Sequence, residues 1–325
     1  EGKHFKLTAN IDLKNEEWTP IGTLQGEEVR PFQGTFDGDG YQITNLKISN
    51  GGQYAGLFGH TEGAVIKSCN VTGKINGYNY TGGIVGYADA NTKILNCSFQ
   101  GNVKGKGEGR GGIVGYMSGG GEVSGCFVTG TVTGDKEVGG IAGYGVGTIK
   151  NCYALANVTA TATATATGVN AGGIAGYAYG VTIENCYYSG DVSAKNYAGG
   201  IAGVMDSTSG SSTTIKNCVS LAESVTAGIN SVNRIAGGVR DNINLINNHS
   251  YNRTKLVIDS KPAYPTGGAG NDVIGADVYI SNGRVMKDVQ KGEVFAWTGF
   301  DKAIWYIPTE AGKLPSLQKG TYPDL

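Results

Sequence analysis

The sequence predicts an all-β protein, a right-handed single-stranded parallel β-helix, and three observations lead to this fold class. The motif GGIVGY at 82–87 returns along the chain with small changes. A short apolar segment that ends in cysteine follows the motif at a nearly fixed distance. The stretch 55–253, which holds these copies, contains no proline. Strands that are paired on both sides cannot give up a backbone donor, so the lack of proline favours stacked interior coils.

The repeat sets the length of one coil. The last glycine of the motif recurs every 27 to 34 residues, a period typical of solenoids. The copies occupy 55–60, 82–87, 111–116, 139–144, 172–177, 199–204 and 234–239. Each unit offers three short segments rich in Gly, Thr and Val, too short for helices, which we expect to form the strands of one coil. Right-handed winding follows the usual crossover preference of parallel strands.

One cysteine stands at the same place in each of the first six repeats. They are Cys69, Cys97, Cys126, Cys152, Cys186 and Cys218. Six cysteines could pair as disulfides in 15 ways. Coils about 4.8 Å apart would instead align these thiols in one inward row, and thiols that point the same way lack the disulfide dihedral angle. We therefore interpret them as small buried apolar side chains.

Asparagine precedes the cysteine position in most repeats. The residues are Asn96, Asn151, Asn185, Asn217 and, in a degenerate copy, Asn247. Stacked amides can hydrogen-bond along a solenoid axis and satisfy the turns. We interpret this row as structural and not as a set of ligands.

A tyrosine row follows the glycine motif and supplies the candidate binding residues Tyr87, Tyr116, Tyr144 and Tyr177. His60 and Val204 hold the same place in the flanking copies. Aligned aromatic rings can stack on sugars or contact a protein. They can equally pack on each other and brace the coils. Bracing is the favoured interpretation, and binding stays open as the alternative.

The chain divides by pattern into three parts of one elongated body. Residues 1–54 are expected to form irregular capping coils, 55–253 the repeat β-helix, and 254–325 a closing segment or cap. In FDGDGYQI (36–43), Asp37 and Asp39 fit a tight turn better than a calcium loop.

Two features of the closing segment carry their own predictions. The sequence GGAGNDVIG at 267–275 is similar to the calcium nonapeptide of RTX toxins, but a single copy gives at most half a site, so a glycine-rich loop is expected. Trp297, Trp305 and LPSL (314–317) are expected to close the far end of the core.

Composition excludes several function classes. The formal net charge is -1, which offers no electrostatic footprint for nucleic acid. No apolar run reaches the roughly 20 residues of a membrane-spanning helix. The three histidines lie in different coils without metal-ligand spacing, so no metal and no cofactor are expected. The acidic residues of the repeats fall at different offsets from the motif, which gives no column of catalytic carboxylates.

The repeat resembles the GLUG motif, and Gly56-Leu57-Phe58-Gly59 matches that name letter for letter. Segments 5–13, 18–22 and 32–48 resemble the part that precedes such repeats in large Bacteroidetes proteins, and 295–317 resembles their closing segment. GLUG repeats occur in bacterial surface and secreted proteins and in some immunoglobulin-cleaving metallopeptidases. Those enzymes carry HExxH in a separate zinc domain, and this sequence has no HExxH motif.

The resemblance implies a non-catalytic adhesion or binding module, extracellular or at the cell surface, with a glycan or a host surface protein as partner. A lipid anchor upstream of Glu1 would fit this location, and the sequence itself shows no signal peptide. Two alternatives stay open: a β-helical polysaccharide lyase or glycoside hydrolase, and a purely structural spacer in a larger surface protein.

Overall fold

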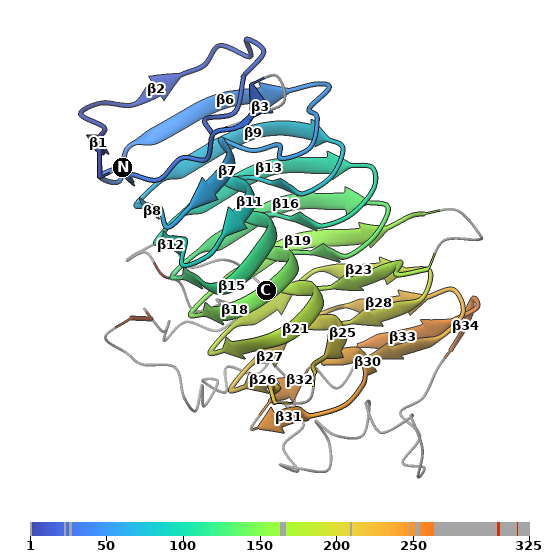
Figure 1. Cartoon of the computed structure of the whole chain (residues 1–325). Helices are drawn as coiled ribbons and strands as arrows, with labels where there is room; N and C mark the ends of the chain where they lie inside the picture. Colours follow the sequence, from blue (N-terminus) through green and yellow to red (C-terminus); the bar gives the residue numbers. More distant parts are fainter. Residues whose placement is uncertain are drawn as a thin grey trace.

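The chain winds into a stack of β-coils, seen in a computed structural model (Figure 1). The structure describes residues 2–22, 24–25, 28–162, 167–208, 210–246, 248–250, 254–262, 304–305 and 317. Within these ranges every regular element is a strand, and the coils pair with one another in parallel. The predicted all-β parallel β-helix is confirmed.

Two thirteen-stranded sheets and one six-stranded sheet run along the stack. Sheet 1 contains β1 (His4–Lys6), β5 (Thr35–Asp37), β7 (Phe58–Glu62), β8 (Val65–Lys67), β11 (Val85–Asp89), β12 (Lys93–Leu95), β15 (Val114–Ser124), β18 (Ala142–Lys150), β21 (Ala175–Glu184), β25 (Ala202–Asp206), β26 (Thr213–Lys216), β30 (Ala236–Val239) and β31 (Ile243–Ile246). Sheet 2 contains β10 (Thr81–Gly82), β14 (Arg110–Gly111), β17 (Val138–Gly139), β20 (Asn170–Gly172), β24 (Tyr197–Gly199) and β29 (Ser231–Asn233).

Sheet 3 completes the coils. It contains β2 (Ile11–Asp12), β6 (Gln42–Ile48), β9 (Asn70–Gly77), β13 (Ser98–Gly105), β16 (Phe127–Gly134), β19 (Tyr153–Ala160), β22 (Tyr187–Ser189), β23 (Asp191–Ala194), β27 (Val219–Ser220), β28 (Ser224–Ala227), β32 (His249–Ser250), β33 (Lys255–Ile258) and β34 (Lys261–Pro262). A short antiparallel pair, β3 (Leu24–Gln25) and β4 (Glu28–Val29), lies outside the three sheets.

The paired glycines of the motif lie where backbone meets backbone. A Cβ atom on Gly82 would lie 2.1 Å from the carbonyl oxygen of Val85. A Cβ atom on Gly83 would lie 2.2 Å from the carbonyl oxygen of Gly112 and 2.3 Å from the ring of Phe99. Only glycine fits so close an approach, which is why this pair repeats with the coil.

The core is a continuous apolar column inside the coils. Rows of like residues fill it because the register repeats from coil to coil. One fully buried row consists of Ile66, Ile94, Val123, Ile149, Ile183 and Ile215. Such branched side chains pack well on a pleated surface.

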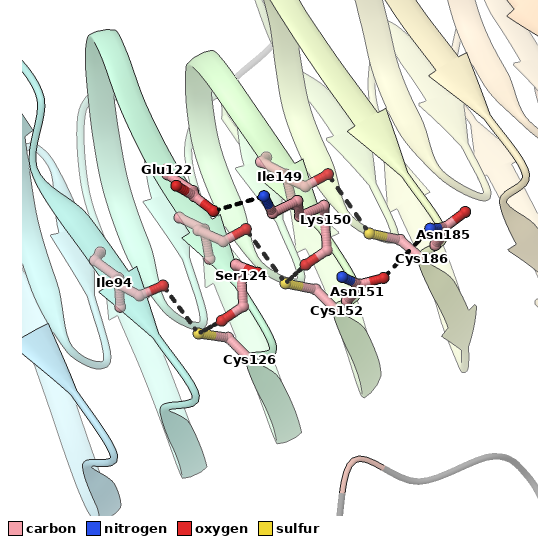
Figure 2. Close-up of polar contacts among 11 residues, drawn as sticks. Ile94, Glu122, Ser124, Cys126, Ile149, Lys150, Asn151, Cys152, Asn185 and Cys186 are labelled. Atoms are coloured by element: carbon pink, nitrogen blue, oxygen red, sulfur yellow. Dashed lines mark hydrogen bonds and ion pairs between the residues drawn. The ribbon is translucent and has the colours of Figure 1, made fainter. Parts of the chain in front are cut away.

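All six cysteines are free thiols with no solvent exposure. Figure 2 shows three of them in a file across successive coils. The thiol of Cys126 donates to the carbonyl oxygens of Ser124 at 3.4 Å and Ile94 at 3.5 Å, so this thiol contacts its own coil and the one before it. Burial raises the pKa of the Cys152 and Cys186 thiols.

The position before each cysteine is a corner with left-handed backbone geometry. Positive φ angles of 52° to 65° occur at Ser68, Asn96, Gly125, Asn151, Asn185 and Asn217. Asparagine tolerates this conformation better than most residues. The Asn185 amide donates to Asn151 Oδ1 at 3.3 Å, and the Asn217 amide donates to Asn185 Oδ1 at 3.2 Å (Figure 2 shows the first pair). Asn96 stands apart from this chain of amides because the next coil has Gly125. Asn247 lies outside the described residues.

The prediction that Trp305 closes the far end of the core is wrong. Trp305 is buried on the outer flank, where its ring lies 6.1 Å from Tyr153 and 5.7 Å from Tyr187. Those two tyrosines stack at 4.9 Å and form, with Val219 and Leu221, a cluster separate from the core. Leu317 packs against the same cluster. Trp297 and the segment 267–275 lie outside the described residues.

The two carboxylates of the turn at 36–43 form ion pairs with lysines of the chain. The backbone N–H of Asp39 donates to Asp37 Oδ1 at 2.9 Å, which is the local hydrogen bond of an Asx turn. Lys67 pairs with Asp37 at 2.8 Å, and Lys6 pairs with Asp39 at 3.0 Å. The carboxylates thus have lysine partners, in agreement with the predicted turn.

Candidate functional site: the tyrosine row

The four candidate tyrosines lie in one row on the outer face of sheet 1. Strand register aligns Tyr87 with Tyr116, Tyr116 with Tyr144, and Tyr144 with Tyr177. Each is half-buried, and the residues on both sides of it in its strand are mostly buried, because alternate side chains point into the core. We call Tyr87, Tyr116, Tyr144 and Tyr177 the tyrosine row.

The rings of the row stack on one another. Ring centroids are 4.9, 4.8 and 5.1 Å apart along the row, and the interplanar angles are 0°, 15° and 10°. Each face that points along the axis therefore lies against the next ring. What the row presents to solvent is a line of ring edges and hydroxyl groups at the spacing of the coils, so sugars have few free ring faces on which to stack.

A second pair of rings, missed in the sequence, packs beside the row. Tyr54 and Tyr80 stack at 6.0 Å, and Tyr80 meets Tyr87 and Tyr116 edge-on at 5.5 and 5.1 Å. Both have positive φ, 60° and 48°, which is unusual for a bulky residue. The same backbone region is used by Gly109 in the next coil, so the motif has no fixed residue there that could have revealed these rings.

His60 ends the row on the side nearest the N-terminus. It takes the tyrosine position of its coil and meets Tyr87 edge-on at 5.0 Å. Its Nε2 atom lies 3.8 Å from Asp89 Oδ2, and burial lowers the pKa of the imidazole. Asp89 Oδ1 accepts from the Ser118 hydroxyl at 2.7 Å, and this hydrogen bond is the largest cause of the lowered pKa of Asp89.

An ion pair lies at the other end of the row, beside Tyr177. The hydroxyl of Tyr177 donates to Asp206 Oδ2 at 2.5 Å, and Arg240 Nη1 lies 2.9 Å from the same oxygen. The guanidinium carbon of Arg240 lies 6.0 Å from the Tyr177 ring centroid, within cation–π range. Val204 replaces tyrosine in the coil between these residues, so Arg240 reaches across the place where the stack stops.

Burial raises the pKa values of the phenols, so they stay protonated, and it also raises the pKa of one carboxyl group. It raises the pKa of Tyr87 to about 12 and the pKa values of Tyr144 and Tyr177 further. Burial, followed by repulsion from Glu108, raises the pKa of the half-buried Glu137 to about 7. Tyr87, Tyr116 and Tyr144 therefore present hydrogen-bond donors at neutral pH, beside a mainly acidic border, whereas the Tyr177 hydroxyl already donates to Asp206.

Two negative findings concern the described residues only. They contain no group of three or more His, Cys, Asp or Glu side chains that could hold a metal ion. They also form no apolar helix of membrane-spanning length.

The repeat that carries Tyr87, Asn96 and Cys97 decides the relationship to known proteins. Residues 77–104 match the family described as the GLUG motif. The chain carries a GLUG motif. A "Putative Gly-rich membrane protein" of Evansella cellulosilytica is 36% identical over 81 residues, which span 22% of this chain and 9% of that protein.

Two solved structures share the fold of this chain. A "putative immunoglobulin A1 protease" from Bacteroides ovatus superposes with a TM-score of 0.58 at 24% identity, over 98% of this chain and 86% of that one. A structure named "IgA1 Protease" superposes with a TM-score of 0.55 at 23% identity, over 78% of this chain but 20% of its own length. At this identity the likeness establishes the fold alone.

Proposed function

We propose that this chain is a non-catalytic binding module of a larger extracellular or cell-surface protein, and that the tyrosine row contacts its ligand. The observation that carries the proposal is the line of solvent-facing phenol groups on a stacked, rigid support. Tyrosine gives large contact area at low entropic cost, and stacking lowers that cost further because the rings are already ordered.

The geometry favours an extended, polar and uncharged ligand, such as a neutral glycan, over an acidic one. Hydroxyl groups spaced by one coil can donate to and accept from a chain of sugar hydroxyls or peptide groups. The border of the row carries Glu62, Asp89, Glu108, Glu137 and Asp206, with Lys136 and Arg240 already paired to acids. A sulfated or uronic acid polymer would meet repulsion there.

The surface location is supported by the relatives. The GLUG motif and the relative named as a Gly-rich membrane protein both fit a protein displayed outside the cell. The chain spans 9% of that relative, which supports a module in a longer polypeptide.

The test separates the hydroxyl groups from the rings. Glycan-array and surface-protein screening of the full chain should identify a ligand, and Tyr116→Phe with Tyr144→Phe should weaken its capture while the melting temperature stays unchanged. Tyr78→Phe is the matched control, because Tyr78 is 54% exposed outside the row. Unchanged capture by the double Phe variant would rule out the proposed site.

Two other outcomes would favour the alternatives. Loss of stability in Tyr116→Ala, with no ligand found on any array, would favour a structural spacer. Release of sugars from a polysaccharide, or of fragments from immunoglobulin A, by the purified chain would contradict a non-catalytic role. The second substrate is included because both structural relatives are named for that protease activity.

A further inference from the structure

A column of residues beside the tyrosine row has a backbone conformation that favours glycine, yet it mostly holds larger side chains. Strand register places its members in successive coils. The φ angle is 60° at Tyr54, 48° at Tyr80, 69° at Gly109 and 43° at Glu137. Glycine adopts such angles freely, whereas tyrosine and glutamate are strained there, and strain of this kind clusters at binding sites. We call these four residues the flank column.

Tyr80 lies beside the tyrosine row and not within it. Its ring meets the stacked rings of Tyr87 and Tyr116 at 63° to each, with centroids 5.5 and 5.1 Å away. It also covers the buried Gly109, on which a Cβ atom would lie 3.0 Å from Tyr80 Cδ1. Tyr80 itself is half-buried, so one side of its ring lies on the protein and the other side faces solvent.

Tyr54 extends this aromatic surface by one coil. Its ring is within 13° of parallel to the ring of Tyr80 and 6.0 Å away, whereas Tyr87 and Tyr116 are 4.9 Å apart in the row. Nearly parallel rings at the larger separation are more offset, so they cover less of each other's faces. The flank column therefore offers ring faces of the kind that stacking covers in the tyrosine row.

Carboxyl groups lie at the edge of this aromatic surface. Burial first, with Glu108 and Glu137 among the further causes, raises the pKa of Tyr80, so both carboxyl groups lie near its phenol group. The Glu108 side chain is 52% exposed and pairs with Lys136 at 3.6 Å. An apolar face thus lies next to hydrogen-bond acceptors.

We propose that Tyr80 and Tyr54 form a subsite on which a pyranose ring of a neutral glycan stacks, with Glu108 and Glu137 as acceptors for its hydroxyl groups. A glucose unit suits both parts, because its axial C–H groups pack on an aromatic face and its equatorial hydroxyl groups donate to carboxylates. A polyuronate would meet repulsion from the same carboxylates. This subsite rests on the proposed function and narrows its ligand to glycans, because it adds the apolar contact that the ring edges of the tyrosine row lack.

The probes are fluorescently labelled cellohexaose and laminarihexaose, with hexagalacturonate as the charged comparison. Fluorescence anisotropy measures their binding to the full chain. Tyr80→Asn should weaken the binding of a neutral probe roughly tenfold, because the ring face is lost. Asparagine tolerates positive φ, as Asn96 at 53° shows, so the melting temperature should stay within a few degrees.

Two further variants separate the ring from its surroundings. Tyr80→Phe keeps the ring face and should weaken binding less than about threefold. Tyr78→Asn is the matched control, because it makes the same replacement at an exposed tyrosine outside the flank column, and it should leave binding unchanged. A second measurement needs no variant: the C–H proton signals of the bound neutral probe should shift upfield, as protons above an aromatic face do.

The subsite would be overturned by equal binding of a neutral probe to the unchanged chain and Tyr80→Asn, by tighter binding of hexagalacturonate, by the absence of an upfield shift, or by no binding of either neutral probe. The proposed function fails separately, since the double Phe variant of Tyr116 and Tyr144 removes hydroxyl groups of the row and leaves Tyr80 in place. A neutral probe that responds to that variant but not to Tyr80→Asn would support the row and overturn the subsite. Capture of a surface protein, with no glycan bound, would do the same.

Discussion

The rings of Tyr116 and Tyr144 lie 4.8 Å apart and 15° from parallel, although 28 residues of chain separate them. Such stacking makes each ring a support for its neighbours as well as part of the surface. We expect Tyr144→Ala to lower the free energy of unfolding by about 2 kcal/mol, since ring contact and apolar burial are both lost. Tyr144→Phe keeps the stack and should change it by less than about 0.5 kcal/mol. Urea denaturation measures both, and equal effects would show that the ring does not brace the coils.

The corner at Asn185 gives a prediction about backbone geometry. Its φ is 52°, and Gly125 holds the same place in another coil. Asn185→Ala should cost about 2 kcal/mol, because alanine is disfavoured in the left-handed region and the amide link to Asn151 is lost. Asn185→Gly should cost about 1 kcal/mol, because only the hydrogen bonds are lost. Chemical denaturation would contradict this account if alanine were tolerated as well as glycine.

The raised pKa of Glu137 predicts that the stability of the folded chain depends on pH. Its pKa rises from 4.5 to about 7 on folding, so the folded state holds the proton more tightly than the unfolded chain. Stability should therefore fall as pH rises from about 4.5 to 7 and stay lower above that range. Glu137→Gln removes the ionisation, so the variant should gain stability over the unchanged chain at pH 8 but not at pH 4. The measurement is urea denaturation at both pH values.

The control for this prediction is Glu16→Gln, an exposed carboxylate in the opening segment. It should leave the pH profile unchanged. An identical shift in both variants would point to net charge and not to the burial of Glu137.

The buried thiols should be unreactive in the folded chain. All six cysteines are free and have no solvent exposure, and burial raises the pKa of Cys152 and Cys186. Thiolate is the reactive form, so a disulfide-exchange reagent should label none of them in the folded chain and all six in denaturant. Labelling of a thiol under native conditions faster than global unfolding would show that the core opens locally.

The fold was predictable because its cause is local and periodic. Gly82 and Gly83 repeat because backbones meet there, and Cys97 or Cys126 repeats because constant register keeps one place small and buried. The corner before the cysteine could be predicted only in part from the sequence. Its requirement is a positive φ, which Ser68, Asn96 and Gly125 meet with different side chains.

Features that do not repeat along the chain could not be predicted from the sequence. Tyr54 and Tyr80 occupy a place that glycine and glutamate fill elsewhere, so no motif marks them. Trp305 was expected at the end of the core, yet it packs on Tyr153 and Tyr187. Nothing in the local sequences NCYA (151–154) and NCYY (185–188) indicates that Tyr153 and Tyr187 point outward and pack against a residue distant in the sequence.

The even step of the tyrosine row has a consequence for a ligand built of identical units. Moving such a polymer by one coil replaces each contact with an equivalent one, so several alignments have similar energy. The bound polymer would keep some freedom to slide, and the number of alignments would add favourable entropy to the association. Affinity should then increase with polymer length beyond the point at which every tyrosine is already engaged.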